Sequence, residues 1–333
     1  MLPPNARRIP MKRTLAALFG ASLVAAFGAA PPASADLVTT CVGEGGAVTV
    51  PNDLVVPAGQ SCTLDGTTIQ GNVTVRAGAD LVGTGVTIEG NTIVQGDAYL
   101  DLTDSSVGGN LANRAGYGVY LDYSSVQRYT GTGDNADTFL SALGTTFVGK
   151  VSATSGAFQL EGSQAGRAVE VSNAYYADLI DSVVVGQVSL DGAAYGSLVC
   201  GSEIDGDASF TDNAYGVQLG AGGPLGGCDL GSSVWGGDVD VSGTTGDVQV
   251  SDNIIRGNLS GEGNDPAPVA SDNRVRGELL GQFAEAPAAN APRFGTHSMR
   301  TAQAVRAEVD TAREVRVVEA QEAAEAAGPA DLG

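Results

Sequence analysis

The sequence has few of the residues that carry most enzyme chemistry. It contains one His, three Met, one Trp and only 5% aromatic residues in 333 positions. The single histidine is His297, near the C-terminus. Nucleophilic triads and three-Asp-plus-His hydrolase sites both need a histidine beside the reacting groups. The rest of the chain therefore excludes both kinds of site.

Basic side chains are also scarce, at 17 against 38 acidic ones. Without the first 35 residues, 13 basic side chains and a net charge of −25 remain, and Lys150 is the only lysine. Such a surface repels nucleic acid and anionic lipid, because phosphate binding needs clusters of Lys and Arg. Two interpretations of the acidity stay open, namely solubility outside the cell and cation binding.

Residues 1–35 have the pattern of a secretory signal peptide. Lys12 and Arg13 form a positive segment, an apolar run extends from Leu15 to Ala30, and Ala33-Ser34-Ala35 is a small-x-small cleavage site. The mature chain is then expected to begin at Asp36. No other stretch approaches the roughly 20 apolar residues of a membrane-spanning helix. We therefore expect a secreted, extracellular protein that does not insert into a membrane.

Two details of export stay open. Arg7-Arg8 can belong to a twin-arginine signal, although Pro10 stands where such signals usually carry an apolar residue. The start codon can encode Met1 or Met11, because the positive segment is complete from Met11 onward.

The four cysteines fit an exported protein with disulfide bonds. Cys41 and Cys62 flank one short segment, and Cys200 and Cys228 flank another. We predict these two bridges, although four cysteines allow three pairings. Zinc binding is not indicated, because the chain has no CxxC motif.

A glycine that recurs at intervals near 20 residues indicates a repeat architecture. Arg128 is assigned to the same slot in the fourth coil. The intervals are 19, 19, 19, 21, 17, 20, 20, 31, 20 and 20. The anchors are Gly71, Gly90, Gly109, Arg128, Gly149, Gly166, Gly186, Gly206, Gly237, Gly257 and Gly277.

Alternation around each anchor predicts one half-buried strand per repeat. The position two before the anchor is apolar in every coil except at Gln164, and the position after it is polar in every coil except at Tyr129. Inward and outward residues that alternate in this way are typical of a β-strand. Such strands bury their inner faces only when successive coils stack. We therefore expect an all-β fold, a right-handed parallel β-helix of about 11 coils of about 20 residues.

The expected organisation has five segments. They are the signal peptide at 1–35, an N-terminal cap at 36–63, the β-helix at 64–283, an Ala/Pro-rich linker at 284–297, and a helical or partly disordered tail at 298–333. A cap is expected because the end coils expose an open sheet edge. Residues 298–327 have a helical composition, and we interpret them either as a partly ordered tail or as a helix that binds a protein partner.

Three features carry a resemblance to a known family. They are the GNV/GNL coils, the cysteine-bearing segment before them, and the closing Gly257-Asn258-Leu259 and Asn264-Asp265-Pro266-Ala267-Pro268 elements. In these features the chain resembles a group of secreted actinobacterial proteins. These are right-handed parallel β-helix repeat proteins of mostly unassigned function. The resemblance covers about residues 41–283. Family members usually carry a cysteine in the closing coil and another soon after it, which this chain lacks. Cytosolic bactofilins look similar, but the signal peptide and cysteines argue against that assignment.

An aromatic column is expected nine residues after the anchor in four consecutive coils, at Phe158, Tyr175, Tyr195 and Tyr215. Stacked rings can form a platform for sugar rings. The alternative is a ladder that only stabilises the stack.

Three basic residues, Arg128, Lys150 and Arg167, fall in successive coils. On one face they can hold a polyuronate carboxylate, with Lys150 or an arginine as general base, as in polysaccharide lyases built on this fold. Such enzymes usually need calcium bound by converging Asp residues. Scattered surface charge is the alternative.

Two further features are candidates for binding. Asp252 and Asp272 lie 20 residues apart and should stack, which costs energy unless a cation or protons lie between them, so the pair is a candidate Ca²⁺ site. An 11-residue insertion around Gly220 to Cys228 is expected to protrude, and protruding loops on solenoids often carry binding.

Two functional hypotheses follow. The first is a secreted, non-enzymatic structural or adhesive β-helix that binds extracellular or cell-wall glycan along its aromatic and Asn-rich faces, with no cofactor. The second is a calcium-assisted lyase that acts on an anionic polysaccharide.

Overall fold

The computed structural model describes residues 38–133, 138–223, 225–285 and 296–333. Residues 36–333 form one compact unit. The expected signal peptide and most of the expected linker lie outside the described residues.

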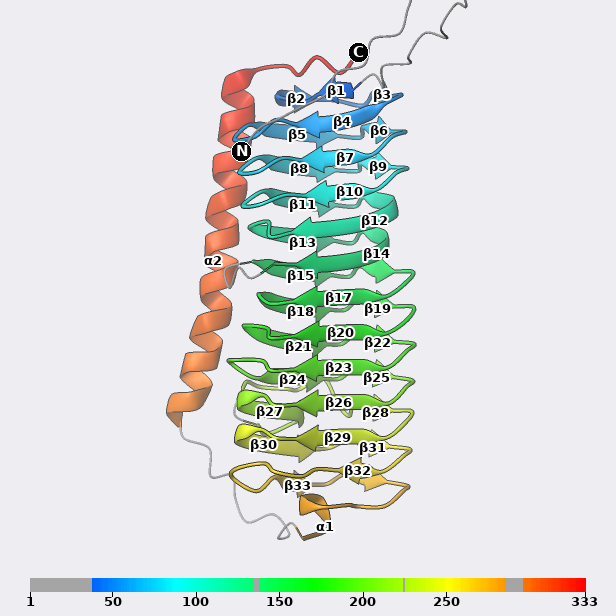
Figure 1. The fold of residues 1–333 in the computed structure, drawn as a ribbon, viewed down its shortest axis with the longest axis vertical. Helices are drawn as coiled ribbons and strands as arrows, with labels where there is room; N and C mark the ends of the chain where they lie inside the picture. The colour runs from blue at the N-terminus through cyan, green and yellow to red at the C-terminus, as the bar shows by residue number, and fades with distance from the viewer. Residues whose placement is uncertain (1–37, 134–137, 224, 286–295) are drawn as a thin grey trace, which may run out of the picture. The chain divides into compact units, whose positions relative to one another are not determined.

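The described chain is a parallel β-solenoid, as predicted, followed by a C-terminal helix (Figure 1). Each coil adds one strand to each of three faces, and every strand pairs in parallel with the strand one coil away. The faces are named here by their strands. Face 1 is a separate sheet of 12 strands, and faces 2 and 3 together form a sheet of 22 strands.

Face 1 is the face that the C-terminal helix contacts. Its strands are β2 (Gly43–Gly45), β5 (Ser61–Asp65), β8 (Asp80–Thr84), β11 (Tyr99–Thr103), β13 (Gly118–Asp122), β15 (Phe139–Leu143), β18 (Ala157–Glu161), β21 (Tyr176–Ile180), β24 (Ser197–Cys200), β27 (Ala214–Gly220), β30 (Thr245–Ser251) and β33 (Val269–Ser271).

Faces 2 and 3 share two long strands, β12 (Ser106–Arg114) and β14 (Ser125–Thr132). The other strands of face 2 are β1 (Val38–Thr40), β4 (Asp53–Val56), β7 (Val73–Val75), β10 (Thr92–Val94), β17 (Val151–Thr154), β20 (Val169–Ser172), β23 (Val188–Asp191), β26 (Ala208–Thr211), β29 (Val239–Ser242) and β32 (Leu259–Ser260). Those of face 3 are β3 (Thr49–Val50), β6 (Thr68–Ile69), β9 (Thr87–Ile88), β16 (Thr146–Phe147), β19 (Gln164–Ala165), β22 (Val183–Val184), β25 (Glu203–Ile204), β28 (Val234–Trp235), β31 (Ile254–Ile255) and β34 (Arg274–Val275).

The core is a set of like side chains stacked from coil to coil. On face 3, Ile69 pairs with Ile88, and both are completely buried. Trp235 and Ile255 continue the same column and are also completely buried. This stacking buries the apolar positions that the repeat pattern placed inside, which is the main favourable term in the stability of a solenoid.

The anchor glycines are required because neighbouring coils approach closely at this corner. A Cβ atom on Gly90 would lie 2.5 Å from the carbonyl oxygen of Gly71 and 2.9 Å from the nitrogen of Asn72. On Gly257 it would lie 2.5 Å from the oxygen of Gly237. No side chain fits at such distances from the backbone of the next coil.

Two coils depart from the predicted register. Val107 pairs with Val126 but Asn110 pairs with Arg128, so the coil of β14 is one residue shorter at the anchor. Arg128 therefore takes the outward polar position and not the glycine slot, and Tyr129 points into the core.

In the coil of β19, Ala165 pairs with Phe147 and is buried, whereas Gln164 is exposed. The two exceptions to the alternation pattern, Tyr129 and Gln164, are therefore residues that the sequence alignment misplaced by one position.

Short polar side chains line an interior corner and link neighbouring coils. The Ser182 hydroxyl donates to the carbonyl oxygen of Leu160 at 3.2 Å, and the Ser163 N–H donates to the Ser182 hydroxyl at 3.2 Å. Equivalent bonds recur at Ser124 and Ser202. The corner is therefore buried with its polar groups satisfied.

The expected N-terminal cap is wrong, because residues 38–56 form the first coil. β1 pairs with β4, β2 with β5 and β3 with β6 in the register of the later coils. The repeat was not recognised here because Asn52 stands in the anchor slot, between the Val50–Ile69 and Leu54–Val73 pairs.

The chain closes both ends of its own core. At the first coil, the Glu44 N–H donates to the Gly328 oxygen at 2.9 Å, and the Ala330 N–H donates to the Glu44 oxygen at 2.8 Å. Leu332 is 6% exposed and belongs to the central core. At the other end, Phe283 of α1 (Gln282–Glu285) is buried in the same core. The cap of the first coil therefore comes from the C-terminus.

The C-terminal helix, α2 (Thr296–Ala327), matches the helix predicted at 298–327. It contacts β5, β2 and β8 on face 1. No helix among the described residues is both long and apolar enough to cross a bilayer.

Both predicted disulfides are confirmed. The Cα–Cα distances are 5.7 Å for Cys41–Cys62 and 5.6 Å for Cys200–Cys228, and the described residues contain no free cysteine. The two bonds indicate an oxidising environment.

Replacing an anchor glycine should destabilise the stack. We expect Gly90→Ala to lower the free energy of unfolding by about 2 kcal/mol, because its methyl group overlaps the backbone of the neighbouring coil. Urea unfolding followed by circular dichroism measures this. Gly46→Ala is the matched control, since a Cβ atom added there would meet no other atom within 4 Å. Equal losses in both variants would contradict the close-approach explanation.

Candidate functional site

The outer surface of face 1 presents aromatic and acidic side chains on alternate positions. Tyr99 and Tyr176 lie in one outward column, and Asp101, Tyr120 and Asp178 lie in the next. Because side chains alternate along a strand, both columns point away from the core. The face is nonetheless buried where α2 lies over it, and Tyr99 is completely buried.

Three arginines of α2 bind this face. Arg306 donates through Nη2 to Asp178 Oδ1 at 2.7 Å, and Arg316 donates through Nε to Asp80 Oδ1 at 2.7 Å. Arg313 lies 3.6 Å from Asp101. The spacing of seven and three residues places all three arginines on one side of the helix.

Each of these arginines also lies against a tyrosine ring. The guanidinium carbons are 4.7 Å from the ring centre of Tyr176 for Arg306, 3.4 Å from Tyr120 for Arg313, and 5.1 Å from Tyr117 for Arg316. Cation–π contacts of this kind strengthen when they are withdrawn from water. Charge and ring contacts together explain why a helix with a weak apolar stripe packs on the rod.

Burial changes the titration of the groups under α2. It raises the pKa of Asp80 and Asp101, and the ion pairs with Arg316 and Arg313 offset this only in part. Burial also raises the pKa of the Tyr99 hydroxyl, which donates to Asp101 at 2.6 Å. For Arg306, burial opposes the charge, but the carboxylate of Asp178 outweighs it and raises the pKa of the guanidinium.

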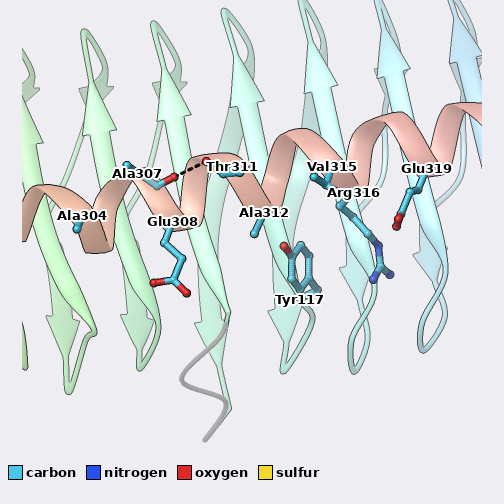
Figure 2. Close-up of a pocket in the computed structure, with 9 residues that line it drawn as sticks. All are labelled: Tyr117, Ala304, Ala307, Glu308, Thr311, Ala312, Val315, Arg316 and Glu319. Carbon is cyan, nitrogen blue, oxygen red and sulfur yellow. Dashed lines mark hydrogen bonds between the residues drawn. The ribbon is translucent and has the colours of Figure 1, made fainter.

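A groove of about 710 Å³ runs beside α2 (Figure 2). Tyr117 and Arg316 line it from opposite elements, and Ala304, Ala312 and Val315 supply apolar helix positions. A second hollow of about 440 Å³ shares Tyr117 and Ala312 and continues to Tyr175. We call these two spaces the tail groove; an aromatic ring and small side chains bound it.

The predicted aromatic column is correct for three of its four residues. Ring centres of Tyr175 and Tyr195 are 4.6 Å apart, and those of Tyr195 and Tyr215 are 5.8 Å apart, all three half-buried. Phe158 does not belong to it, because it pairs with Leu140 and Ala177 on an inward column and is completely buried. Because Ala157 pairs with Tyr176, Phe158 lies two positions away from the residue opposite Tyr175.

The three basic candidates do not converge. Arg128 and Lys150 occupy the same outward column, because Tyr129 pairs with Val151. Lys150 forms an ion pair with Glu170, both 40% exposed. Arg167 lies one position out of register, since Val169 pairs with Val151.

A second groove of about 630 Å³ lies on the outer side of face 2. We call it the sheet groove. Asn91, Asn110 and Arg128 form one rim, Arg114 stands on the other, and Thr130 lies between them. The Asn rim is a ladder in which each side-chain oxygen accepts the N–H of the next coil, from Asn72 to Asn91 and from Asn91 to Asn110, both at 2.9 Å.

The acidic pair has a conformational explanation. Asp252 and Asp272 have φ values of 57° and 56°, in the left-handed region that Gly144 and Gly201 occupy at the same corner of other coils. Asp tolerates this conformation better than most residues. Within the described residues, no group of three or more His, Cys, Asp and Glu side chains is placed to hold a metal ion.

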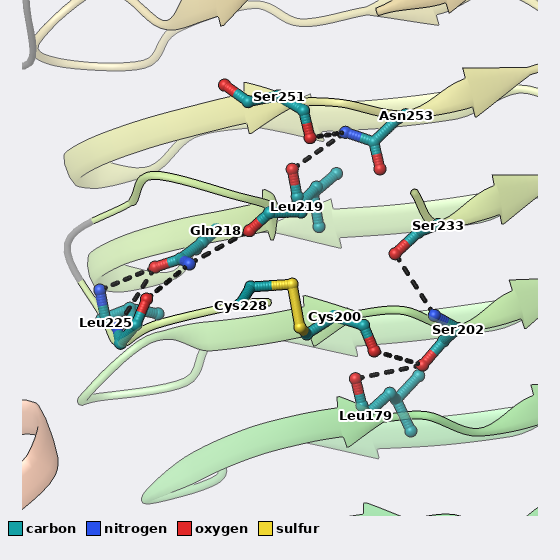
Figure 3. Close-up of a disulfide and its surroundings, with 12 residues drawn as sticks. Leu179, Cys200, Ser202, Gln218, Leu219, Leu225, Cys228, Ser233, Ser251 and Asn253 are labelled. Atoms are coloured by element: carbon teal, nitrogen blue, oxygen red, sulfur yellow. Dashed lines mark hydrogen bonds between the residues drawn. A yellow bond between two sulfur atoms is a disulfide. The ribbon is translucent and has the colours of Figure 1, made fainter. Parts of the chain in front are cut away.

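The expected protruding loop is instead folded onto face 1 (Figure 3). Gln218 Oε1 accepts the Leu225 N–H at 2.8 Å, and Leu225 is buried against Leu198 and the Cys200–Cys228 disulfide. The loop therefore covers the part of face 1 where the outward column carries Leu198.

The aromatic and acidic surface of face 1 that binds α2 was not predicted from the sequence. The signal was present in Tyr99-x-Asp101 and Tyr176-x-Asp178, where an aromatic and an acidic residue share the outward side of a strand. This signal was missed because the repeat pattern alone does not distinguish the strands of face 1 from those of face 3.

Removing the central ion pair should release α2. We expect Arg306→Gln to reduce the docking free energy of the helix by about 3 kcal/mol, since it leaves the buried Asp178 without a counter-charge. Hydrogen exchange of the α2 amides should become markedly faster, while that of the core strands stays unchanged. Glu314→Gln, an exposed charge change on the same helix, should leave exchange as it is. Unchanged exchange in Arg306→Gln would contradict the docking.

The raised pKa values predict a pH dependence of stability. A carboxyl whose pKa is raised by folding binds protons more readily in the folded state, so its contribution is present at low pH and is lost as pH rises through the folded pKa. The free energy of unfolding of the native chain, relative to Asp80→Asn/Asp101→Asn, should therefore fall as pH rises from 3.8 upward. Urea titrations between pH 3.5 and 7 measure this, and a difference that rises with pH would refute it.

Comparison with protein-family models, with curated proteins and with solved structures finds no match.

Proposed function

We propose that this protein is an exported, non-enzymatic structural module that binds extracellular or cell-wall glycan. The observation that carries the proposal is that polar side chains form hydrogen bonds that hold neighbouring coils together. The Asn ladder and the interior Ser corner link neighbouring coils, and Asp252 and Asp272 fill a left-handed corner position. A rod closed at both ends by its own chain is suited to a mechanical role.

Export is part of the proposal. Two disulfides form only in an oxidising environment. The signal-peptide pattern of residues 1–35 supports secretion.

Glycan is the ligand class that the two grooves favour. The tail groove offers the ring of Tyr117 beside small helix side chains, and aromatic rings stack on the apolar faces of sugars. The sheet groove offers Asn, Thr and Arg side chains that hydrogen-bond hydroxyl and carboxylate groups.

A calcium-assisted polysaccharide lyase is the second candidate, because Arg128 and Lys150 stack in one column. The Lys150–Glu170 ion pair argues against Lys150 as a general base, since the amine is already engaged by a carboxylate of the protein.

A binding panel tests the proposal. Purified residues 36–333 are mixed with neutral and anionic polysaccharides, with and without calcium, and co-sedimentation and ultraviolet absorbance of unsaturated product are recorded together. We expect co-sedimentation with at least one polysaccharide and no rise in absorbance. A rise that disappears in Lys150→Ala would establish the lyase. Absence of any co-sedimentation would refute glycan binding.

A further inference from the structure

We infer that the sheet groove is a binding site for an acidic polysaccharide that carries uronate carboxylates. The inference rests on the proposed glycan binding and names its ligand class and location. Three features of the described residues coincide at this groove: a break in the regular coil, two arginines without an acidic partner, and a hollow with a floor of small side chains.

The break in the coil places Arg128 on the surface. In most coils a glycine corner separates the face 3 strand from the face 2 strand, but β12 and β14 run through this corner as continuous strands of nine and eight residues. The register between them shifts between Val107 and Asn110. Such bulges re-aim side chains and occur often beside binding sites.

The two arginines stand at opposite rims of the groove. Arg128 pairs with Asn110, and Arg114 pairs with Thr132, so four strand positions separate them. At about 3.3 Å per residue this is roughly 13 Å, which is longer than a single sugar unit. Ala112 and Thr130 occupy the positions between, and their small side chains leave the floor open.

No acidic side chain of the described residues neutralises either arginine. Within the described ranges, Arg114 and Arg128 form no ion pair, although acidic residues outnumber basic ones 38 to 17 in the chain. Asp53, the acidic side chain that lines the groove, accepts hydrogen bonds from the backbone and side-chain nitrogens of Asn72. The guanidinium fork matches a carboxylate in two parallel hydrogen bonds. A polymer with regularly spaced carboxylates would supply the missing counter-charges.

The hydroxyl and amide groups of the groove fit the rest of such a polymer. Thr74 and Thr130 lie on the floor column, and Asn91 and Asn110 on the rim. These side chains can exchange hydrogen bonds with sugar hydroxyls. The ligand would therefore be held by charge at the two rims and by neutral hydrogen bonds between them.

The test uses a soluble galacturonate oligomer and its methyl ester, in which each carboxylate has lost its negative charge and gained a methyl group. Residues 36–333 are titrated with each by calorimetry. We expect the acid to bind at least tenfold more tightly than the ester. We also expect Arg114→Gln/Arg128→Gln to lower the affinity for the acid at least tenfold.

Arg256→Gln/Arg274→Gln is the matched control, because it makes the same charge change at exposed positions of the last coils. It should stay within twofold of the native affinity. Circular dichroism checks that both variants keep the fold.

Equal affinity for acid and ester, or equal losses in the two double variants, would overturn the inference. So would native affinity in Arg114→Gln/Arg128→Gln. In each of these cases glycan binding itself would stand. Failure of the native chain to retain any polysaccharide would instead refute the proposed function.

Discussion

The whole structure depends on how closely one coil can approach the next. At the corner before face 2, the backbones come so near that a Cβ atom on Gly90 or Gly257 would overlap the neighbouring chain. This contact fixes the register of all three faces, and the register brings like residues together in the core and in the polar ladders. In two neighbouring coils, β12 and β14 instead run through this corner as continuous strands, and the sheet groove lies on them.

A solenoid has two open ends, and this chain covers them with its own C-terminal part. Phe283 closes the last coil, and the segment after α2 adds hydrogen bonds to Glu44 and places Leu332 in the core of the first coil. The helix between them is held by three arginines on an acidic and aromatic face. These three arginines are therefore paired within the molecule, although the chain as a whole is strongly acidic. Pro329 has no N–H and therefore limits further pairing at the covered edge.

Much of the fold could be predicted from the sequence because the repeat is local. The glycine spacing and the alternation around it indicated the solenoid, and the spacing of the cysteines favoured both disulfides. The candidate site was less accessible. Phe158 and Arg128 were misplaced because coils of unequal length shift the alignment, by two residues at Phe158 and by one at Arg128. The first coil was not recognised, because Asn52 stands where most later coils have the anchor glycine. The pairing of Arg306 with Asp178 joins positions 128 residues apart, and no periodic pattern reports such a contact.

The central claim is that stacking engages most polar side chains and leaves recognition to the place where stacking is irregular. A crystal structure of residues 36–333 with a short galacturonate oligomer tests this most directly. We predict that the oligomer binds on β12 and β14, with its carboxylates at Arg114 and Arg128. An oligomer bound in the tail groove beside Tyr117, with the sheet groove empty, would contradict it.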